Sequence, residues 1–571
     1  MASPAARSNR LGRLVPAVGW LPRYERRWLR GDVTAGIAVT ALIVPKNLGY
    51  AGIAGVPLQN GLYAAAAGAI IYALFCTSRQ ISTGPSSSLA AVAGGAVLST
   101  GLGGHDAAQL VAGITLATGV LFLLFAVFRL GWVAQFLSRA VVVGFLAGAA
   151  IDVVIGELPK LTGTSSDGDN AWRELASWAR SLDATHGTTL VVALVSLLAI
   201  LLLRFRAPAV PGALVLVAGG LIASAVFDLQ AHGVAVVGHV PRGVPAPQLP
   251  SWDLLHAHAA SIGIAAFALL LIGFSQNAGD ARAFAARHRY RIDVNQESVA
   301  QGLANIGSGG LQGIPVSTSL SASSLNESAG AQTPVASLTT GALVIATLVL
   351  LAPLFSHLPT AVLGAVIIDA VVFGMIDIAE MRRLRRVARF DFWVAVAAII
   401  GVLSVGVLAG VVVGVILSLG WLVYVATRPP MPLLGRDPAG TNVFRDLDER
   451  PELETTPGLA ILRLDGGLFF ATAEALEVRV RQLVENGDNH TLILNMEGVP
   501  FIDSQGAHKL TELYTYLDSE GVSLHLARLK PQVQRVLAAD GYLDLAGGDH
   551  VHQTINLALH HLGMDTPIPD N

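Results

Sequence analysis

Up to about residue 427, the chain consists of one apolar stretch of membrane length after another. Only 13% of its 571 residues are charged, half the ~25% that is usual in soluble proteins. Its mean hydropathy is +0.58. A membrane-spanning helix needs about 20 mostly apolar residues. The composition therefore predicts an α-helical integral membrane protein. The one cysteine, Cys76, excludes a disulfide within the chain and a cysteine-rich metal site.

Apolar stretches of this kind number about fourteen, and several of them are short or broken. Their centres lie near residues 43, 69, 93, 118, 147, 195, 217, 267, 301, 322, 344, 369, 400 and 417. Arginine-rich loops face the cytoplasm. Seven arginines precede the first span, and the clusters around 79, 129, 204–206, 282–291 and 382–389 all follow even-numbered spans. We therefore expect a multi-pass plasma-membrane protein with both termini in the cytoplasm, and with the connections 158–187 and 227–257 outside the cell.

Two apolar stretches, one in each half of this region, are interrupted by a proline followed by serines. The first reads Thr83-Gly84-Pro85-Ser86-Ser87-Ser88, and the second reads Gly313-Ile314-Pro315-Val316-Ser317-Thr318-Ser319. Irregular backbone inside a bilayer is tolerated only where it lines a cavity or is buried in protein. Paired interruptions at corresponding positions of two halves are the best sequence indication of a transporter's binding site.

Each interruption is also expected to start a helix, because proline favours the first helical turn and serine is a good N-cap. Pro85 with Ser86–Ser88 then begins a half-helix that runs outward through Ala90–Leu98, and Pro315 with Ser317–Ser323 begins one that runs inward. Two helix N-termini would meet near the midplane, where free N–H groups and about half a positive charge per terminus favour an anion. The alternative is a kinked span whose serines pack against neighbouring helices.

Several short motifs, taken in this order, resemble those of the sulfate permease (SulP) family, also called solute carrier family 26. They are Gly31-Asp32-Val33-Thr34-Ala35-Gly36, Ser78-Arg79-Gln80-Ile81-Ser82-Thr83-Gly84-Pro85, Ala281-Arg282-Ala283-Phe284-Ala285, Asn295-Gln296-Glu297 with Asn305, Gly313-Ile314-Pro315-Val316-Ser317, and Ile502-Asp503-Ser504-Gln505-Gly506. The resemblance implies fourteen transmembrane segments in a 7+7 inverted repeat of the uracil-permease type. It also implies a mobile core unit that carries the anion past a fixed gate unit like an elevator, usually in a homodimer.

The chain departs from the family's pattern at three positions. The family's first span commonly reads Pro-Gln-x-x-Ala-Tyr-Ala, whereas Pro45-Lys46-Asn47-Leu48-Gly49-Tyr50-Ala51 has lysine in the glutamine position. Ala322 stands where many members have an arginine, and Gln276 stands where many bacterial members have an acid. A different acid, Asp280, follows one helical turn later on roughly the same face.

Lys46 can be weighed on physical grounds. A lysine within a span costs roughly 3 kcal/mol on insertion scales, so it is expected to face a cavity or a partner. Our hypothesis is that Lys46 supplies the positive charge that Ala322 lacks. The alternative is a lysine that snorkels to the interface or pairs with Asp280 or Asp369.

The predicted substrate site combines the first span, both interruptions and the eighth span. Its residues are Lys46, Asn47, Tyr50, Pro85, Ser86, Ser87, Ser88, Gln276, Asn277, Pro315, Val316, Ser317, Thr318 and Ser319. Asp280 is the coupling candidate, because a buried acid near an anion can carry a proton. Asp280, Asn277 and backbone carbonyls would also suit Na⁺ chemically. Co-transport of H⁺ or Na⁺ is left open, and neither a bound metal nor another cofactor is expected.

After a polar, proline-containing segment, the periodicity becomes that of a soluble domain. Strands are expected at Leu459–Leu464, Thr491–Met496 and Ser523–Ala527, and helices at Ala473–Glu485, from Asp503 or Ser504 through Ser519, and at Pro531–Ala539. This alternation predicts an α/β layer. The domain resembles the STAS domain shared by sulfate transporters and anti-sigma-factor antagonists, in which the serine matching Ser504 is phosphorylated. A plain helix cap is the other interpretation of Ser504. A cytoplasmic protein or a nucleotide is the partner expected for this domain, and nucleic acid is not.

We therefore predict a cytoplasmic N-terminal segment at 1–30, a transport domain at 31–427 with repeats at 31–226 and 258–427, a linker at 428–456 and a STAS domain at 457–571. The predicted function is secondary active transport of a small anion, sulfate or bicarbonate first. The alternatives are an anion channel or an exchanger for chloride or dicarboxylates, and a nucleobase permease. The sequence has no recognisable nucleophile–base or metal-ligand pattern, the seven histidines of the last domain included, so an enzyme is not expected.

Overall fold

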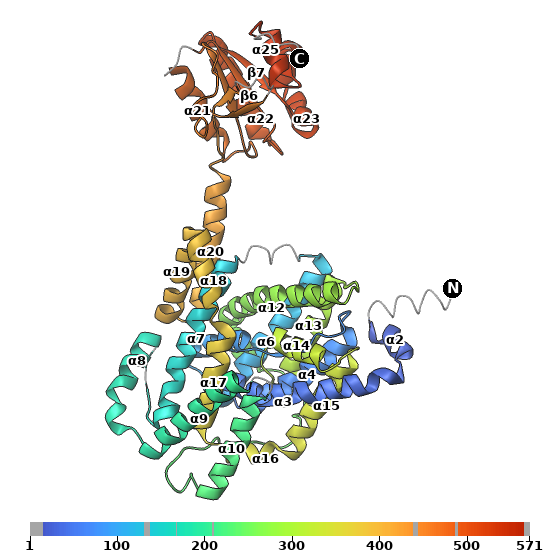
Figure 1. Ribbon diagram of the computed structural model, residues 1–571, viewed down its shortest axis with the longest axis vertical. Helices are drawn as coiled ribbons and strands as arrows, with labels where there is room; N and C mark the ends of the chain where they lie inside the picture. Colours follow the sequence, from blue (N-terminus) through green and yellow to red (C-terminus); the bar gives the residue numbers. More distant parts are fainter. Residues whose placement is uncertain are drawn as a thin grey trace. The chain divides into compact units, whose positions relative to one another are not determined.

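The computed structural model describes residues 15–130, 138–166, 168, 170–207, 210–437, 443–485 and 489–564 (Figure 1). Residues 1–14 of the predicted N-terminal segment, 438–442 of the predicted linker and 565–571 of the predicted terminal domain lie outside this description. The chain divides into two compact units, Met1–Ser418 and Leu419–Asn571.

A helix lies at the place of every one of the fourteen predicted spans, as far as the described residues extend. In the first half these helices are α3 Leu29–Ile53, α4 Gln59–Phe75, α5 Ser87–Thr100, α6 Gly104–Phe128, α7 Arg139–Thr162, α9 Gly187–Arg206 and α10 Gly212–Phe227. In the second half they are α12 Ala259–Arg287, α13 Val294–Gly310, α14 Leu320–Ser328, α15 Val335–Leu350, α17 Thr360–Met375, α19 Arg389–Val405 and α20 Val407–Ala426. The order is seven helices followed by seven, with a short strand before α5 and another before α14.

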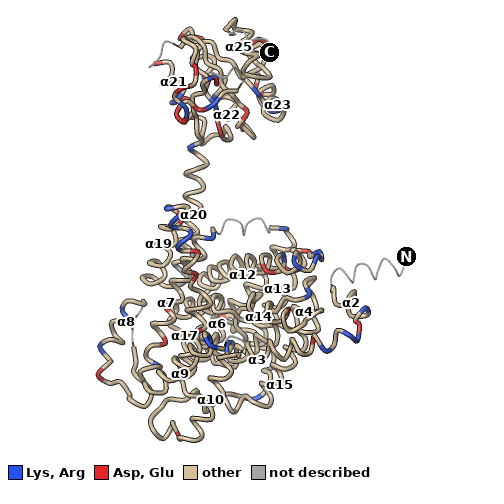
Figure 2. Tube along the Cα trace, in the orientation of Figure 1, with Lys and Arg blue, Asp and Glu red and all other residues tan. Residues whose placement is uncertain are grey.

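In the described chain, six helical segments are long enough and apolar enough to cross a membrane. They are Arg26–Ile53, Gly104–Phe128, Arg139–Thr162, Gly187–Arg206, Ala259–Arg287 and Thr360–Val387, and four shorter apolar helices accompany them. Figure 2 shows charged residues gathered near helix ends and in the C-terminal unit, with long uncharged lengths of helix between them. This distribution is typical of helices surrounded by lipid.

The two halves interleave into two groups of helices. In the first group, which we call the core group (α3–α6 and α12–α15), α13 packs against α4 and α6, and α15 packs against α3 and α4. In the second, the gate group (α7, α9, α10, α17, α19 and α20), α17 and α19 pack against α7, and α17 also packs against α9. The groups meet where α17 and α10 contact α3. The chain thus builds each group from both halves.

The C-terminal unit is an α/β layer with a four-stranded parallel sheet in the order β5-β6-β7-β8. Its strands are β5 Leu459–Arg463, β6 Thr491–Asn495, β7 Ser523–Ala527 and β8 Val551–His552. Alternate strand residues face opposite sides. One side packs against α21 Ala473–Glu485, α22 Ser504–Ser519, α23 Pro531–Asp540 and α24 Tyr542–Ala546, and the other packs against α25 Ile555–His561. The predicted strands and helices are confirmed, with ends that differ by one residue at most.

The segment expected to be a linker contains a hairpin that belongs to this unit. Strand β3, Leu434–Arg436, pairs antiparallel with β4, Phe444–Asp446. Leu433 forms a bridge to Leu462 of β5, and Leu434 packs in the same apolar cluster as α25. The hairpin therefore covers part of the sheet rather than standing apart from it.

The contact between α3 and α4 depends on a glycine. A Cβ atom at Gly61 would lie 1.9 Å from the carbonyl oxygen of Asn47, whereas a Cβ at Gly219 of α10 would meet nothing within 4 Å. We expect Gly61→Ala to lower stability by about 1–3 kcal/mol, because backbone must move to admit the methyl group. Gly219→Ala is the matched control and should leave the melting temperature unchanged or slightly raised, since alanine favours helices. Thermal unfolding of the purified protein checks this, and equal melting temperatures would contradict it.

Candidate functional site

The two interrupted segments pair with each other in the middle of the core group. Strand β1, Thr83–Pro85, lies antiparallel to β2, Val316–Thr318, and Gly84 is opposite Ser317. Helix α5 begins directly after β1, and α14 begins soon after β2. Because the strands are antiparallel, the helices run in opposite directions, and the positive ends of both helices face the strand pair. Two opposed half-helices, as predicted, are confirmed.

The prediction that each proline opens its helix is wrong. Pro85 is the last residue of β1, and Pro315 lies just before β2. The N-caps are serines instead: Ser86 accepts a hydrogen bond from the Leu89 amide, and Ser319 accepts one from the Ala322 amide, both at 3.4 Å. Proline's fixed φ suits extended backbone as well as a first helical turn, so the breaks contain three extended residues that local pattern did not separate from helix.

Side chains of α13 hold the second strand in place. Asn305 accepts from the Val316 amide at 3.0 Å and donates to the Val316 carbonyl at 3.0 Å. Gln301 donates to the same carbonyl at 2.6 Å. Ser317 donates to the Gly273 carbonyl at 3.3 Å and is completely buried. These bonds satisfy backbone groups that a regular helix would otherwise satisfy.

A small cavity of about 20 Å³, enough for about one water molecule, lies beside the strand pair. Side chains and backbone of α3, β1 and α14 line it, so every wall comes from the core group. The lining residues are Leu42, Ile43, Lys46, Asn47, Tyr50, Ser82, Thr83, Gly84, Pro85, Ser319, Ser321 and Ala322. The cavity thus brings the predicted first-span residues to both helix N-termini.

Buried polar atoms without a partner gather around this cavity. Within the described part of the chain, no hydrogen bond reaches Nδ2 of Asn47 or Oγ1 of Thr83, and both residues line the cavity. Oε1 of Gln276 also has no partner among the described residues, but Gln276 lies beside Ser88 and is not part of the lining. Asn47 and Thr83 are 2% and 1% exposed. Buried polar groups are nearly always hydrogen-bonded, so orphaned atoms at one place mark where a polar ligand or water would bind.

A larger cavity of about 470 Å³ adjoins the first one and shares Leu42 and Lys46 with it. Gate residues from α9, α10 and α17 complete its walls, among them Arg204, Gly212 and Asp369. Arg204 and Asp369 form a two-point ion pair, with Nε–Oδ1 at 2.7 Å and Nη2–Oδ2 at 2.6 Å. The volume of this larger cavity falls within the range of ordinary ligand pockets. Arg204 was expected among cytoplasmic loop residues, and its place in this wall is not evident from the sequence.

The ammonium group of Lys46 makes no hydrogen bond or ion pair within the described residues, although the residue is half-buried. Asp280 accepts a hydrogen bond from Thr318 at 2.9 Å, and Asp369 is engaged by Arg204. The alternative that Lys46 forms a structural ion pair with either acid is therefore not what the structure shows. The lysine instead borders both cavities.

Other predicted site residues are divided between this site and the scaffold. Gln276 donates to Ser88 at 3.2 Å, and Ser88 contacts Ser86 at 3.1 Å, so this group lies at the start of α5. Tyr50 lies beside Ser87. Asn277 is turned away: it accepts from Tyr72 at 3.2 Å and donates to the Glu297 carbonyl at 3.1 Å. Asn277 therefore belongs to a buried scaffold network rather than to the cavity.

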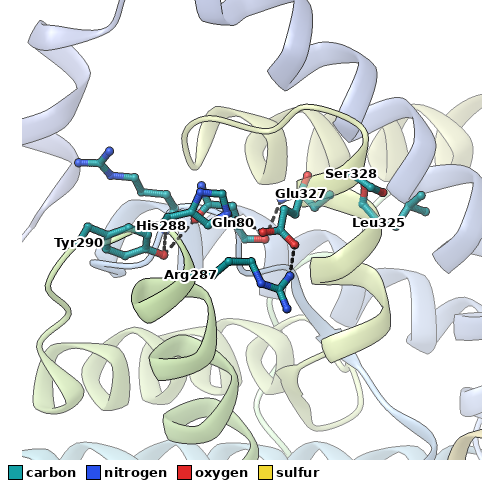
Figure 3. Close-up of polar contacts among 9 residues, drawn as sticks. Gln80, Arg287, His288, Tyr290, Leu325, Glu327 and Ser328 are labelled. Carbon is teal, nitrogen blue, oxygen red and sulfur yellow. Dashed lines mark hydrogen bonds and ion pairs between the residues drawn. The ribbon is translucent and has the colours of Figure 1, made fainter.

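The far end of α14 is anchored to α12 and to the segment before β1 (Figure 3). Glu327 pairs with Arg287 and with His288, both at 2.5 Å. Asn326 donates to the Gln80 carbonyl at 2.9 Å, and Tyr290 donates to the Gln80 side chain at 3.0 Å. The half-helix is thus held at both ends by core-group residues.

In the C-terminal unit, Asp503 and not Ser504 caps α22. Asp503 accepts from the Gly506 amide at 2.7 Å and from the Phe470 amide at 3.1 Å. Ser504 is exposed in the first turn, and its phosphorylation stays a prediction. No group of three metal-binding side chains with suitable geometry occurs in the described parts of the chain.

Four histidines that are scattered in the sequence gather beside β7 and β8. His525 is 3% exposed, stacks on His550 at 4.5 Å between ring centroids, and contacts His552 through ring nitrogens 3.1 Å apart. His561 lies beside His552. Burial, followed by the neighbouring imidazoles, lowers the pKa of His525 to about 4, and burial also lowers the pKa of His552.

Hydrogen exchange can test whether the hydrogen bonds from Asn305 hold β2 in place. In Asn305→Ala the Val316 amide loses its acceptor, and an unsatisfied buried group costs about 1–3 kcal/mol. We expect that amide to exchange about 10-fold faster or more. Asn295→Ala, on the same helix, is the matched control, because the Asn295 side chain makes no hydrogen bond within the described residues. Unchanged protection of Val316 would mean that the strand holds without Asn305.

The histidine cluster predicts a pH dependence of stability in the C-terminal unit. An unfolded histidine has a pKa near 6.5, so between about pH 6.5 and pH 4 the unfolded chain binds more protons than the folded one. Stability should be complete above about pH 6.5 and should fall as the pH drops toward 4. Exchange of the β7 amides, corrected for intrinsic rates, measures this. His525→Phe should flatten the dependence and the exposed His508→Gln should not; the opposite result would contradict the assignment.

Comparison with known families places both units. The sulfate permease family matches residues 29–398, and the STAS domain matches residues 450–558. A protein of Mycobacterium tuberculosis named "Probable sulfate transporter" is 36% identical over 553 residues, which is 95% of this chain and 98% of that protein. "High affinity sulfate transporter 1" of Stylosanthes hamata is 31% identical over 581 residues, with 97% and 86% covered.

Two solved structures share the fold. The murine Solute Carrier 26 family member A9 anion transporter, in the inward-facing state, superposes with a TM-score of 0.87 at 22% identity over 98% of this chain and 96% of that one. The transmembrane domain of the cyanobacterial bicarbonate transporter BicA gives 0.58 at 20% identity over 70% and 99%. The fold is therefore a helical membrane core of seven plus seven helices followed by a STAS domain.

Proposed function

The chain belongs to the sulfate permease family, and on that premise we propose that it is a secondary active transporter of a small anion across the plasma membrane. Members of this family are transporters, and the protein is not an enzyme. Sulfate is the first candidate substrate, because the relatives at 36% and 31% identity are named sulfate transporters. Bicarbonate is the second.

The observation that carries this proposal is the Lys46 ammonium, which has no hydrogen-bond or ion-pair partner among the residues that the structure describes. It stands on the lining of both cavities, next to two helix N-termini and near the orphaned atoms of Asn47 and Thr83. Lys46 is half-buried, and withdrawing a cation from water without giving it a partner costs free energy. An anion that binds here would receive one full charge, two helix dipoles and several unused donors. Lys46 thus supports the hypothesis that it replaces the arginine missing at Ala322.

The division of the cavities supports an elevator-type movement. The described residues that line the small cavity all belong to the core group, whereas gate residues form one wall of the large cavity. A substrate held by α3, β1 and α14 would remain with the core group while that group moves past the gate. The 470 Å³ space would then be the route by which the anion enters or leaves on one side.

Asp280 is the group we propose for cation coupling. Its hydrogen bond from Thr318 places it at the end of β2, one residue before the N-cap of α14. A carboxylate that close to the anion can bind H⁺ or Na⁺ together with the substrate.

Replacing Lys46 tests the proposed charge. We expect Lys46→Gln to weaken anion binding by about 10-fold or more, since a single charge near 4 Å contributes several kcal/mol at intermediate dielectric. Lys46→Arg should retain most of the affinity. Lys160→Gln is the matched control, because Lys160 pairs with Glu157 at 2.6 Å and lines neither cavity. Unchanged affinity and rate in Lys46→Gln would remove Lys46 from the site.

Uptake into proteoliposomes tests the function itself. Radiolabelled sulfate, bicarbonate, chloride, a dicarboxylate and uracil would be compared at two pH values, with and without Na⁺. A transporter predicts saturable uptake and stimulation by anion on the opposite side. Uptake that never saturates would indicate the channel, and uptake of uracil alone would indicate the nucleobase permease.

A further inference from the structure

On the gate side of the large cavity lies an ion pair between two residues that were not part of the predicted substrate site. Arg204 on α9 is held by both carboxylate oxygens of Asp369 on α17, and the Phe373 ring lies 4.3 Å from its guanidinium carbon. Asp369 is 8% exposed, while the Arg204 side chain is 36% exposed and faces the cavity. Three contacts therefore fix the orientation of this guanidinium.

The cavity as built has one uncompensated cation. Among the described residues, those on its wall that carry a charge are Lys46, Arg204 and Asp369, and Lys46 interacts electrostatically with the other two. Since Asp369 cancels the charge of Arg204, only the Lys46 charge remains in excess. Nη1 of Arg204 makes no hydrogen bond within the described residues. Arg204 can therefore still donate a hydrogen bond to an anion without adding net charge.

We propose that Asp369 sets the charge selectivity of the site: by neutralising Arg204, it matches the cavity to one negative charge. A monoanion such as bicarbonate is balanced by Lys46 alone, whereas a dianion such as sulfate is bound one charge short and needs a co-bound cation. This inference rests on the proposed function, because it assumes that an anion occupies the space beside Lys46.

The test compares sulfate and bicarbonate binding to purified full-length protein at constant ionic strength near pH 8. Coulomb energy scales with the product of the charges, so a change that multiplies bicarbonate affinity by some factor multiplies sulfate affinity by about its square. We expect Asp369→Asn to raise the ratio of sulfate to bicarbonate affinity by about 10-fold or more. Arg204→Gln should lower that ratio, and it carries the test by itself if Asp369→Asn does not fold.

The double variant Arg204→Gln/Asp369→Asn separates charge from structure. It removes the ion pair but keeps the net charge, so the ratio should return to within about 3-fold of the wild type. Glu380→Gln is the matched control: it also deletes a buried carboxylate from an ion pair, with Arg383 and Arg139, but lines neither cavity. It should leave the ratio unchanged.

The outcomes distinguish this inference from the proposed function. A folded Asp369→Asn or Arg204→Gln protein that binds both anions with the wild-type ratio would overturn the charge filter while leaving anion transport intact. A double variant that keeps the ratio of Asp369→Asn would do the same. If the wild-type protein bound and transported neither anion, the proposed function would fail first, and the filter with it.

Discussion

Backbone pairing between two broken helices is the constraint on which the rest of the transport unit depends. Both breaks lie within apolar, membrane-length sequence, where an unsatisfied N–H or C=O costs several kcal/mol. Neither break can satisfy its own groups, but the antiparallel ladder lets each serve the other. The side chains of Asn305 and Gln301 satisfy the backbone amide and carbonyl of Val316. One interruption alone would leave an open strand edge in the membrane, which explains why each half of the chain supplies one.

The same pairing of β1 with β2 also creates the proposed anion site. Because the strands are antiparallel, the two helices that follow them must diverge, and their N-termini must both point at the ladder. Ser86 and Ser319 cap these helices with their own hydroxyls and leave further donors, including Thr83, beside the small cavity. A site for an anion thus follows from how the backbone is satisfied, and only the full charge of Lys46 has to be added by a side chain.

Sequence reasoning was most successful where the signal is local. Apolar length located every transmembrane helix, and alternation located the strands of the C-terminal unit, because each pattern reports directly on what surrounds an element. The extended residues Thr83–Pro85 and Val316–Thr318 were assigned to helix starts, since their pairing joins positions more than two hundred residues apart. The Arg204–Asp369 pair, 165 residues apart in the chain, was missed for the same reason: an arginine near a helix end has the pattern of a loop anchor. The histidines of the cluster beside β7 likewise follow no regular spacing in the sequence that would predict the cluster.

The positions of the carboxylates of Asp280 and Asp369 affect the release of the anion as well as its binding. Asp369 interacts electrostatically with Lys46, yet it is engaged by Arg204. Asp280 accepts a hydrogen bond from Thr318. The lysine on the core side therefore stays free, while the arginine on the gate side is neutralised. A carrier must release what it binds, and two uncompensated cations facing one cavity would hold a dianion strongly against both groups of helices. With the gate cation neutralised, the excess charge lies on the core group alone, so an anion is attracted to the group that we propose moves and is not pinned to the one that stays.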